Sequence, residues 1–286
     1  MYRQAVSVCF LQLYNVVICF ALWYNKQEGG IMDKITVDSS LCVGCGKCVK
    51  DCVAFALYLE NGKAKVREGC IECGHCFAIC PAGAVDMPAY DKSECTDITS
   101  MEEIDSDTLL QAMKSRRTIR QYKNIPVEQE KIDKILAAGR YAPTGGNSQN
   151  VAFTILDESR AEIERECVKL FRTGVNLGSK FVKFLENTEI NDSFFFKGAP
   201  LVIVVSGHDS VNASLASAYM EIMANSLGLG VLYSGFFCSC TKLNPKIKAR
   251  LRLPRGHKVV TCMIIGYPDV EYKRIAPRKP HEIKKI

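Results

Sequence analysis

The sequence lacks the patterns that mark several common protein classes. No GxGxxG motif lies between an expected strand and an expected helix, which argues against a Rossmann dinucleotide site. No run of lysines and arginines with interleaved aromatic residues occurs, so the net charge of +6 does not favour nucleic-acid binding. The basic excess could equally serve an anionic cofactor or an acidic neighbour.

The first 31 residues lack the features of a signal peptide, because no small-residue cleavage site follows their apolar stretch. Ala5–Tyr24 has the length of a membrane span, but polar residues near its middle argue against a membrane as a partner. Gln27–Gly30, just before Met32, can be encoded by a purine-rich string like a bacterial ribosome-binding site. We interpret residues 1–31 as a mis-called start; a membrane anchor and a soluble extension remain the alternatives.

Cysteine, in contrast, is abundant, and eight of the 15 cysteines form two runs of the pattern CxxCxxCxxxC. The runs comprise Cys42, Cys45, Cys48 and Cys52, and then Cys70, Cys73, Cys76 and Cys80. Three thiolates on a tight loop can hold a [4Fe–4S] cluster from one side, and the fourth must come from elsewhere. A zinc site uses one or two CxxC pairs, and a disulfide framework belongs to an exported protein. The runs therefore predict two [4Fe–4S] clusters.

In the two-cluster ferredoxin arrangement, each run lends its last cysteine to the other cluster. One predicted ligand set is Cys42, Cys45, Cys48 and Cys80, and the other is Cys70, Cys73, Cys76 and Cys52. The residues between the runs alternate in polarity around Asn61-Gly62, which predicts a hairpin that folds one run back on the other. We expect His75 to face solvent and not to be a ligand.

Over about residues 35–88 the sequence resembles bacterial 2[4Fe–4S] ferredoxins, with Val53 where the family usually has a proline. The resemblance implies a ferredoxin domain over residues 32–90, followed by a polar linker over 91–105 and a second domain over 106–286. The seven cysteines outside the runs would survive as free thiols only in a reducing compartment, which points to a cytoplasmic protein. Cys238 and Cys240 are interpreted as buried residues, not as a metal or redox pair.

The second domain mixes expected helices with expected strands. Apolar periodicity predicts helices near 106–115, with Ser106 or Asp107 as the cap, and at 127–140 and 213–227. Apolar runs predict strands at 151–156, 201–206 and 258–266. Strands separated by long helices favour a layered α+β or α/β domain.

Two segments of this domain have side chains suited to ligand binding. Arg116, Arg117, Thr118 and Arg120 offer the planar donors and the hydroxyl that match a phosphate, although such a segment is more often a solvated surface. The segment from Pro143 to Gln149 contains two glycines, and alone it indicates no more than the end of a helix.

Five motifs in register strengthen this interpretation: residues 116–122, 142–149, 197–200, 227–235 and 265–268. Over about residues 105–280 the sequence resembles the FMN-dependent nitroreductase family, in which a preceding ferredoxin domain is a known fusion. The resemblance implies an α+β fold, FMN as cofactor, and a homodimer in which each flavin site draws on both chains.

The resemblance also implies the flavin-binding residues. Arg116, Arg117 and Thr118 match residues at the FMN phosphate, and Arg120 matches a cation at the pyrimidine edge of the ring. Residues matching the segment that reaches the flavin from the partner subunit are Pro143, Thr144, Gly145, Asn147 and Gln149. Residues matching a loop that faces the ring are Gly230, Tyr233, Ser234 and Gly235. Arg278, with Lys279, matches a C-terminal cation at the phosphate, whereas the spacing around Asn191 and Lys197 is too loose to assign either.

FMN is the expected reactive group, and we predict no catalytic triad. The expected reaction passes electrons from the clusters to FMN and on to a nitroaromatic, quinone or activated alkene. Phe194–Phe196 and Phe236–Phe237 are expected to line the acceptor pocket or, equally, to belong to the core. One alternative is an electron carrier or redox sensor without substrate turnover. Another is an NAD(P)H-dependent nitroreductase whose clusters serve a different partner. A ferredoxin or NAD(P)H is the possible electron donor.

Overall fold

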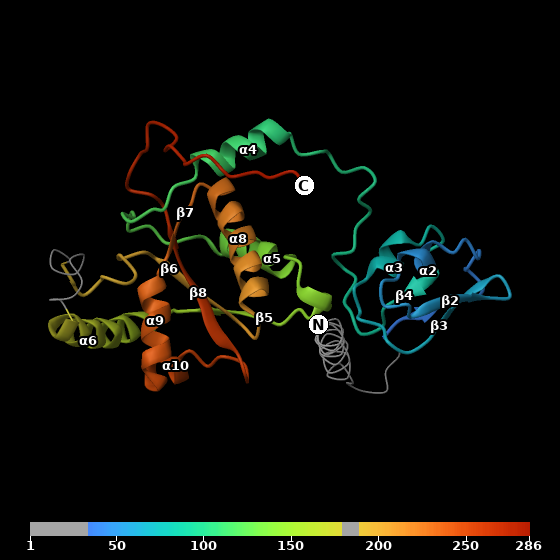
Figure 1. Cartoon of the computed structure of the whole chain (residues 1–286), viewed down its shortest axis with the longest axis horizontal. Coiled ribbons are helices and arrows are strands. Elements are labelled where there is room, and N and C mark those ends of the chain that lie inside the picture. The colour runs from blue at the N-terminus through green and yellow to red at the C-terminus, as the bar shows by residue number, and fades with distance from the viewer. Residues whose placement is uncertain (1–33, 179–188) are drawn as a thin grey trace, which may run out of the picture. The chain divides into compact units, whose positions relative to one another are not determined.

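The computed structural model describes residues 34–178 and 189–286 (Figure 1), so the interpretation of residues 1–31 lies outside the described part of the chain. The chain divides into two compact units. The first ends at Met101 and includes Gly146–Ser148, and the second comprises residues 102–145 and 149–286. Within the described ranges, no helix is both long enough and apolar enough to cross a bilayer.

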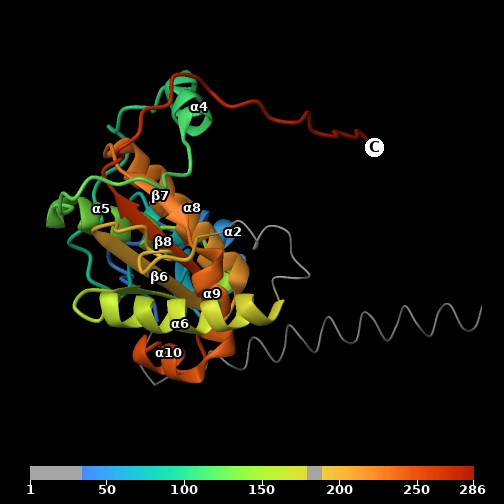
Figure 2. The same cartoon turned by 90° about the vertical axis from the view of Figure 1, so that its left-hand side faces the viewer.

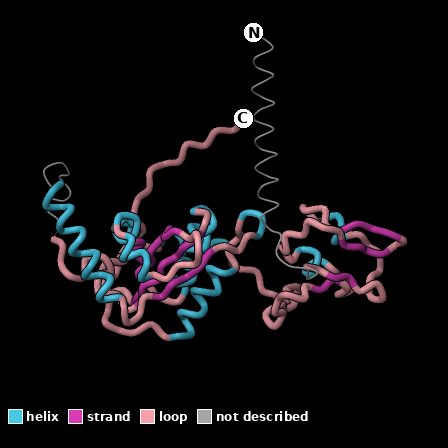
Figure 3. Tube along the Cα trace, turned by 90° about the horizontal axis from the view of Figure 1, so that it is seen from below, coloured by secondary structure: helices cyan, strands magenta, loops and turns pink. Residues whose placement is uncertain are grey.

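Over residues 34–101, the first unit consists of two small antiparallel sheets and two short helices joined by loops (Figure 3). β1 (Thr36–Val37) pairs with β4 (Val85–Asp86), and β2 (Leu57–Glu60) pairs with β3 (Lys63–Val66). Asn61 and Gly62 connect β2 to β3 with φ values of 49° and 71°, and a two-residue turn with positive φ at both positions matches the twist of a hairpin. The predicted hairpin is confirmed.

The two cysteine runs of the first unit have the same local structure. α2 (Lys47–Asp51) carries Cys48 and α3 (His75–Ile79) carries Cys76, and both side chains are buried. Each helix is preceded by a glycine with positive φ, Gly46 at 71° and Gly74 at 76°. A turn in the left-handed region lets the chain double back between the second and third cysteines of each run.

The second unit is built on a four-stranded antiparallel sheet with the order β5-β6-β8-β7. The strands are β5 (Val151–Ile155), β6 (Leu201–Gly207), β7 (Gly230–Tyr233) and β8 (Lys258–Gly266). Every residue of β6 is buried, as its continuous apolar run predicts for a strand covered on both faces. Helices cover both faces of this sheet, which confirms the expected α+β fold.

Alternate residues of the central strands pack against different helices. Ile203 and Met263 belong to a core shared with α5 (Gln129–Arg140) and α8 (Ser210–Ser226). Val204 and Ile264 belong to a core that includes residues of α6, α9 and α10. These helices span Arg160–Gly178, Gly235–Leu243 and Pro245–Arg250. The two helical layers lie on opposite sides of β8 (Figure 1).

The helix boundaries differ from the predicted ones where a side-chain cap decides them. α4 (Ser106–Ser115) is capped by Asp105, whose Oδ2 accepts a hydrogen bond from the Thr108 backbone N–H at 2.8 Å, and not by Ser106 or Asp107. α8 begins three residues earlier than predicted because Asp209 accepts hydrogen bonds from two N–H groups of its first turn. α5 begins two residues late, at Gln129.

The segment that follows α4 runs beside β7 and is held by the backbone. The N–H of Ile119 donates to the carbonyl of Val231 at 3.1 Å, and Thr118 forms a parallel bridge to the same residue. A Cβ atom on Gly230 would lie 2.2 Å from Cγ1 of Ile119. Gly230 is therefore required for the close approach of this segment to the sheet, whatever it contributes to a ligand.

We predict that Gly230→Ala lowers the stability of the protein. Overpacking a tight contact costs about 1–3 kcal/mol, and each kcal/mol lowers Tm by about 2–4 °C in a domain of this size. Gly174→Ala is the matched control, because a Cβ there meets no atom within 4 Å and α6 gains helix propensity. Thermal unfolding followed by circular dichroism measures both, and equal Tm values for the two variants would contradict the packing argument.

Candidate functional site

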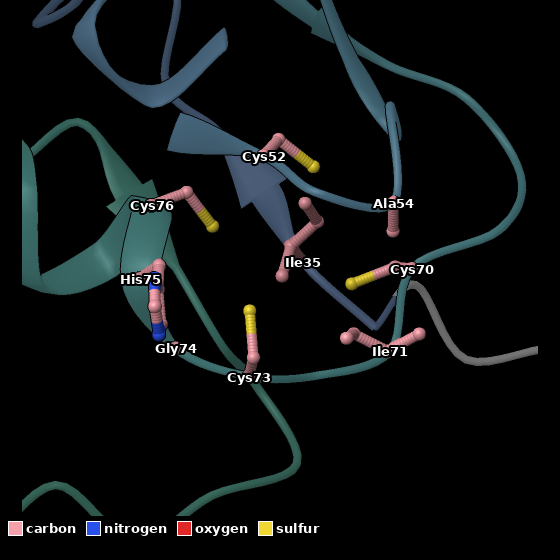
Figure 4. A pocket seen from close by; sticks show the side chains of 9 residues that line it. All are labelled: Ile35, Cys52, Ala54, Cys70, Ile71, Cys73, Gly74, His75 and Cys76. Carbon is pink, nitrogen blue, oxygen red and sulfur yellow. The ribbon is translucent and has the colours of Figure 1, made fainter. Parts of the chain in front are cut away.

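Two pockets in the first unit are lined by four cysteines each. One contains Cys52, Cys70, Cys73 and Cys76 and has, together with the open solvent at its mouth, about 310 Å³ of space not filled by protein atoms. Figure 4 shows these four residues around a common space, with the sulfurs of Cys70, Cys73 and Cys76 directed into it. The other pocket has about 320 Å³ of such space and contains Cys42, Cys45, Cys48 and Cys80. Each pocket thus takes three cysteines from one run and the last cysteine of the other.

Backbone N–H groups point at the sulfur atoms that line these pockets. Ala56 donates to Sγ of Cys52 and Ala84 donates to Sγ of Cys80, both at 3.3 Å. In each run the donor lies four residues after the last cysteine, so the two runs repeat the same contact. Hydrogen bonds to sulfur favour the thiolate form and tune iron–sulfur clusters.

The thiol pKa values reflect burial and these hydrogen bonds. Burial raises the pKa of Cys48 and of Cys70, and it raises the pKa of Cys76 to about 11. The backbone N–H groups of Ala64 and Gly44 lower the pKa of Cys42. Thiols with raised pKa values stay protonated at neutral pH, so metal binding there must displace protons.

The donor set fits iron–sulfur clusters better than single metal ions. No three His, Cys, Asp or Glu side chains of the described residues converge closely enough to hold one ion. The four ligands of a cubane bind four different irons, so their sulfurs lie further apart than the ligands of one zinc ion. His75 is confirmed as solvent-facing, with Nδ1 3.1 Å from Oδ2 of Asp51. The eight-cysteine ligand assignment stays a prediction.

In the second unit, the cationic segment after α4 meets α8 and β7. Arg116 Nη1 donates to Glu221 Oε1 at 2.7 Å, and the Tyr233 hydroxyl lies 3.3 Å from the other oxygen of that carboxylate. The same hydroxyl donates to the carbonyl of Ser217 at 2.9 Å. Arg117 is half-buried and Arg120 is exposed beside this network.

The expectation of a loop at residues 230–235 is wrong. Gly230–Tyr233 form strand β7, because they pair in register with residues 263–266 of β8. Ser234 is buried, its N–H donates to the carbonyl of Cys262 at 2.8 Å, and Gly235 begins α9. A Cβ on Gly235 would meet no atom within 4 Å, so open space remains at the start of this helix.

Lys197, which the sequence left unassigned, adds a second cation near Arg120. Burial lowers the pKa of the Lys197 ammonium, and the charge of Arg120 lowers it further against the opposite effect of Glu164. Its Nζ also lies 4.5 Å from the centroid of the Phe194 ring. Two positive charges therefore share one edge of the candidate site.

The segment from Pro143 to Gln149 is fastened to the start of α8. Asn212 Oδ1 accepts a hydrogen bond from the N–H of Gly145 at 3.0 Å, and the N–H of Gln149 donates to the Thr144 hydroxyl at 3.1 Å. Asn147 has a φ of 54° and Gln149 a φ of 43°, both in the left-handed region. The short helix η1 (Gly145–Asn147) lies within this turn, and Pro143 is exposed.

The strand register puts these two groups of predicted flavin residues at opposite ends of the sheet. Val151, just after the Pro143–Gln149 segment, pairs with Gly207, and Gly207 pairs with Lys258 at the start of β8. Gly230, beside the Arg116–Arg120 segment, pairs with Gly266 at the end of β8. β8 has nine residues, so its ends lie about 27 Å apart. The two groups themselves lie closer than this, because Gly145 contacts Asn212 and Arg116 contacts Glu221, nine residues later on α8, which is about 14 Å along the helix axis.

Within the described residues, no hydrogen bond or ion pair joins the C-terminal cations to Arg116. The Tyr272 hydroxyl donates to the carbonyl of Thr118 at 3.5 Å, and beyond this point the chain runs away from the sheet (Figure 2). Arg278 and Lys279 are exposed, and in the described ranges neither forms an ion pair. Their assignment to the phosphate stays a prediction.

The phenylalanines considered for the acceptor pocket belong mainly to the core. Phe194, Phe195, Phe196 and Phe237 are buried in the core of the second unit, as the second of the two expectations states. Only Phe236 among them is exposed, and its ring centroid lies 5.1 Å from that of Phe171. Cys238 and Cys240 are confirmed as buried.

Sequence reasoning missed Glu221 and Asn212. Each contacts one group of predicted flavin residues, but each lies in α8 outside the family motifs. An isolated glutamate or asparagine in a helix carries no signal of such a contact, because the partner lies 105 residues away for Glu221 and 67 residues away for Asn212.

Comparisons with known proteins support both units. The nitroreductase family model matches residues 113–267, and a 4Fe-4S dicluster domain model matches residues 23–85. A Bacillus subtilis FMN reductase [NAD(P)H] is 28% identical over 187 residues, which cover 61% of this chain and 71% of that protein. A protein of an ion-translocating oxidoreductase complex from Methanosarcina acetivorans is 43% identical over 47 residues. That match covers 16% of this chain and 18% of the Methanosarcina protein.

Solved structures show the same fold for the second unit. A Desulfitobacterium hafniense nitroreductase with bound FMN has a TM-score of 0.53 and is 18% identical, covering 64% of this chain and 100% of that one. At this level of identity the likeness concerns the fold alone.

Crossed ligation can be tested with two double variants. Two [4Fe–4S] clusters bring about eight irons per chain, so losing one leaves about four. Cys52→Ser with Cys76→Ser removes two residues of one pocket and is expected to leave about four irons. Cys48→Ser with Cys52→Ser removes one residue from each pocket and is expected to lose both clusters. Iron and acid-labile sulfide are measured on protein purified without oxygen, and ligation within each run predicts the reverse order.

Proposed function

The chain belongs to the nitroreductase family, and on this premise we propose an FMN-dependent oxidoreductase that receives its electrons from two [4Fe–4S] clusters in its own first domain. The observation that carries the proposal is the pair of four-cysteine pockets on the same chain as a nitroreductase-type sheet. The proposed domains are a ferredoxin domain over residues 32–90, a linker over 91–105 and the FMN domain over 106–286. The free thiols outside the pockets support a reducing, cytoplasmic location.

The residues around β7 suit an anionic flavin. Arg116, Arg117 and Thr118 supply guanidinium and hydroxyl donors for the phosphate, with Arg278 and Lys279 as further cations. Bound FMN would accept electrons singly from the clusters and deliver a hydride or two electrons to the acceptor. Arg120 and Lys197 would stabilise negative charge on the pyrimidine edge of the ring, because fixed cations there need no reorganisation during the reaction. The proposed acceptor is a nitroaromatic, a quinone or an activated alkene.

A second candidate function is NAD(P)H-dependent reduction, with the clusters serving another partner. The similarity to a reductase named for NAD(P)H favours it. The two candidates differ in the electron donor and not in the FMN site. A carrier or sensor without turnover is the third possibility, and the lack of any acceptor turnover would support it.

We further propose that the protein is a homodimer. In it, the Pro143–Gln149 segment of one copy would complete the flavin site that Arg116–Arg120 form in the other. The two groups contact α8 at different points, Asn212 and Glu221, and this arrangement supports the assembly. A row of exposed apolar residues also follows one face of α8 at intervals of three and four: Val211, Leu215, Tyr219 and Ile222. An apolar helix face of this kind suits burial against a second copy of the chain.

The electron path can be tested by rapid mixing of oxygen-free protein. We expect reduced ferredoxin to bleach the flavin absorbance and a nitro or enone compound to restore it. The Cys52→Ser/Cys48→Ser variant should lose ferredoxin-driven reduction and retain FMN, because its second unit is unchanged. Flavin bleaching by NAD(P)H alone, at equal rates in both proteins, would favour the second candidate function. Protein without FMN would contradict the flavoprotein assignment.

The shared site predicts complementation between two defective chains. Arg116→Ala with Thr118→Ala disables one group of flavin residues, and Asn147→Ala with Gln149→Ala disables the other. Each homodimer should lose FMN, whereas a heterodimer of the two has one intact site and should bind about half the FMN of the wild-type dimer. The heterodimer is isolated with two affinity tags, and its flavin is counted by absorbance. A heterodimer without flavin would show that each site lies within one chain.

A further inference from the structure

Glu221 occupies an unexpected position beside the predicted phosphate site. Its side chain is 14% exposed, and Oε1 lies 2.7 Å from Nη1 of Arg116. Its other oxygen lies 3.3 Å from the hydroxyl of Tyr233. The carboxylate therefore links three separate elements: α8, which carries it, the end of α4, and β7.

If the Glu221 carboxylate acted only as a negative charge, it would repel a bound phosphate and weaken its binding. The Arg116 side chain is 26% exposed, so the pair is partly shielded from water and the repulsion is screened less than on an open surface. An uncharged residue would serve a phosphate site better on this ground alone. The geometry of the contact suggests a different role.

The ion pair uses one nitrogen of Arg116. Within the part of the chain that the structure describes, this is the only ion pair of that guanidinium. Arginine has five N–H donors in a planar fork, so donors remain for a second anion. A free arginine side chain loses rotamer entropy when it binds a ligand. An arginine that the fold already holds loses less of this entropy on binding.

We propose that Glu221 is a positioning residue that holds Arg116 ready for the phosphate of FMN; this inference rests on the proposed function. Glu221 itself does not contact the flavin. The Tyr233 hydroxyl, whose single proton is shared between the Ser217 carbonyl at 2.9 Å and the other oxygen of the carboxylate at 3.3 Å, also contacts Glu221. The role differs from that of a structural ion pair, because its effect depends on the phosphate group of the ligand.

Comparing FMN with riboflavin tests this role, because riboflavin has the same ring system without the phosphate. Immobilising one long side chain costs about 0.5–1.5 kcal/mol on binding, so Glu221→Ala is expected to weaken FMN binding up to about tenfold. Glu221→Gln keeps an acceptor oxygen and should weaken it less. Riboflavin binding should stay within about twofold of wild type for both variants, because riboflavin makes no phosphate contact.

The measurement is fluorescence titration of full-length protein from which flavin has been removed, with the clusters left in place. Glu130→Gln is the matched control, since Glu130 is an exposed carboxylate paired with Lys134 at 2.7 Å on α5. Both Glu221 variants are expected to fold, because Tyr233 keeps its Ser217 partner and Arg116 can reach water. Thermal unfolding of the flavin-free variants checks that they fold.

The possible outcomes separate the inference from the proposed function. Wild-type protein that binds neither flavin contradicts the proposed function. If wild-type protein binds FMN and Glu221→Ala binds it equally well or more tightly, the inference alone is contradicted. Tighter binding by Glu221→Ala would show that the carboxylate acts as a repulsive charge. An equal loss for FMN and riboflavin also contradicts it, because that result indicates a structural ion pair.

Discussion

The antiparallel pairing of β8 with β6 on one side and β7 on the other is the constraint on which the second unit depends. It makes β8 central, buries six of its nine residues and gives the sheet two apolar faces, each covered by its own helices. It also fixes which segments lie at each end of the sheet. The Arg116–Arg120 segment lies at the end where β7 begins, and the Pro143–Gln149 segment lies at the end where β8 begins. The proposed dimer would bring the first segment of one copy to the second segment of the other.

The first unit depends on a different kind of constraint. Its core is small, and the cysteines Cys42, Cys48 and Cys76 are among its buried residues. Domains of this size rarely gain enough stability from apolar burial alone, and metal sites often supply the difference. The repeated turn, short helix and N–H···S contact of the two runs bring eight thiols to two pockets. The same thiols therefore serve both folding and the proposed electron transfer.

α8 connects the two ends of the sheet through two polar contacts. Near its start, Asn212 accepts a hydrogen bond from Gly145. Further along the helix, Glu221 holds Arg116. A helix with its apolar face in the core and its other face open to a second copy can thus orient one flavin segment at each end. This arrangement gives α8 a part in the proposed site that its own sequence does not indicate.

Short sequence patterns by themselves determined much of the structure of this protein. The cysteine spacing, the Asn61-Gly62 turn and the apolar run of β6 each express a requirement that neighbouring residues satisfy among themselves. Tertiary structure decided the rest. Residues 230–233 form a strand because β8 lies beside them, Phe195 and Phe196 are buried because helices cover them, and Glu221 meets Arg116 only after α8 packs against α4. Such contacts join residues far apart in the chain, so the sequence around each residue does not reveal them.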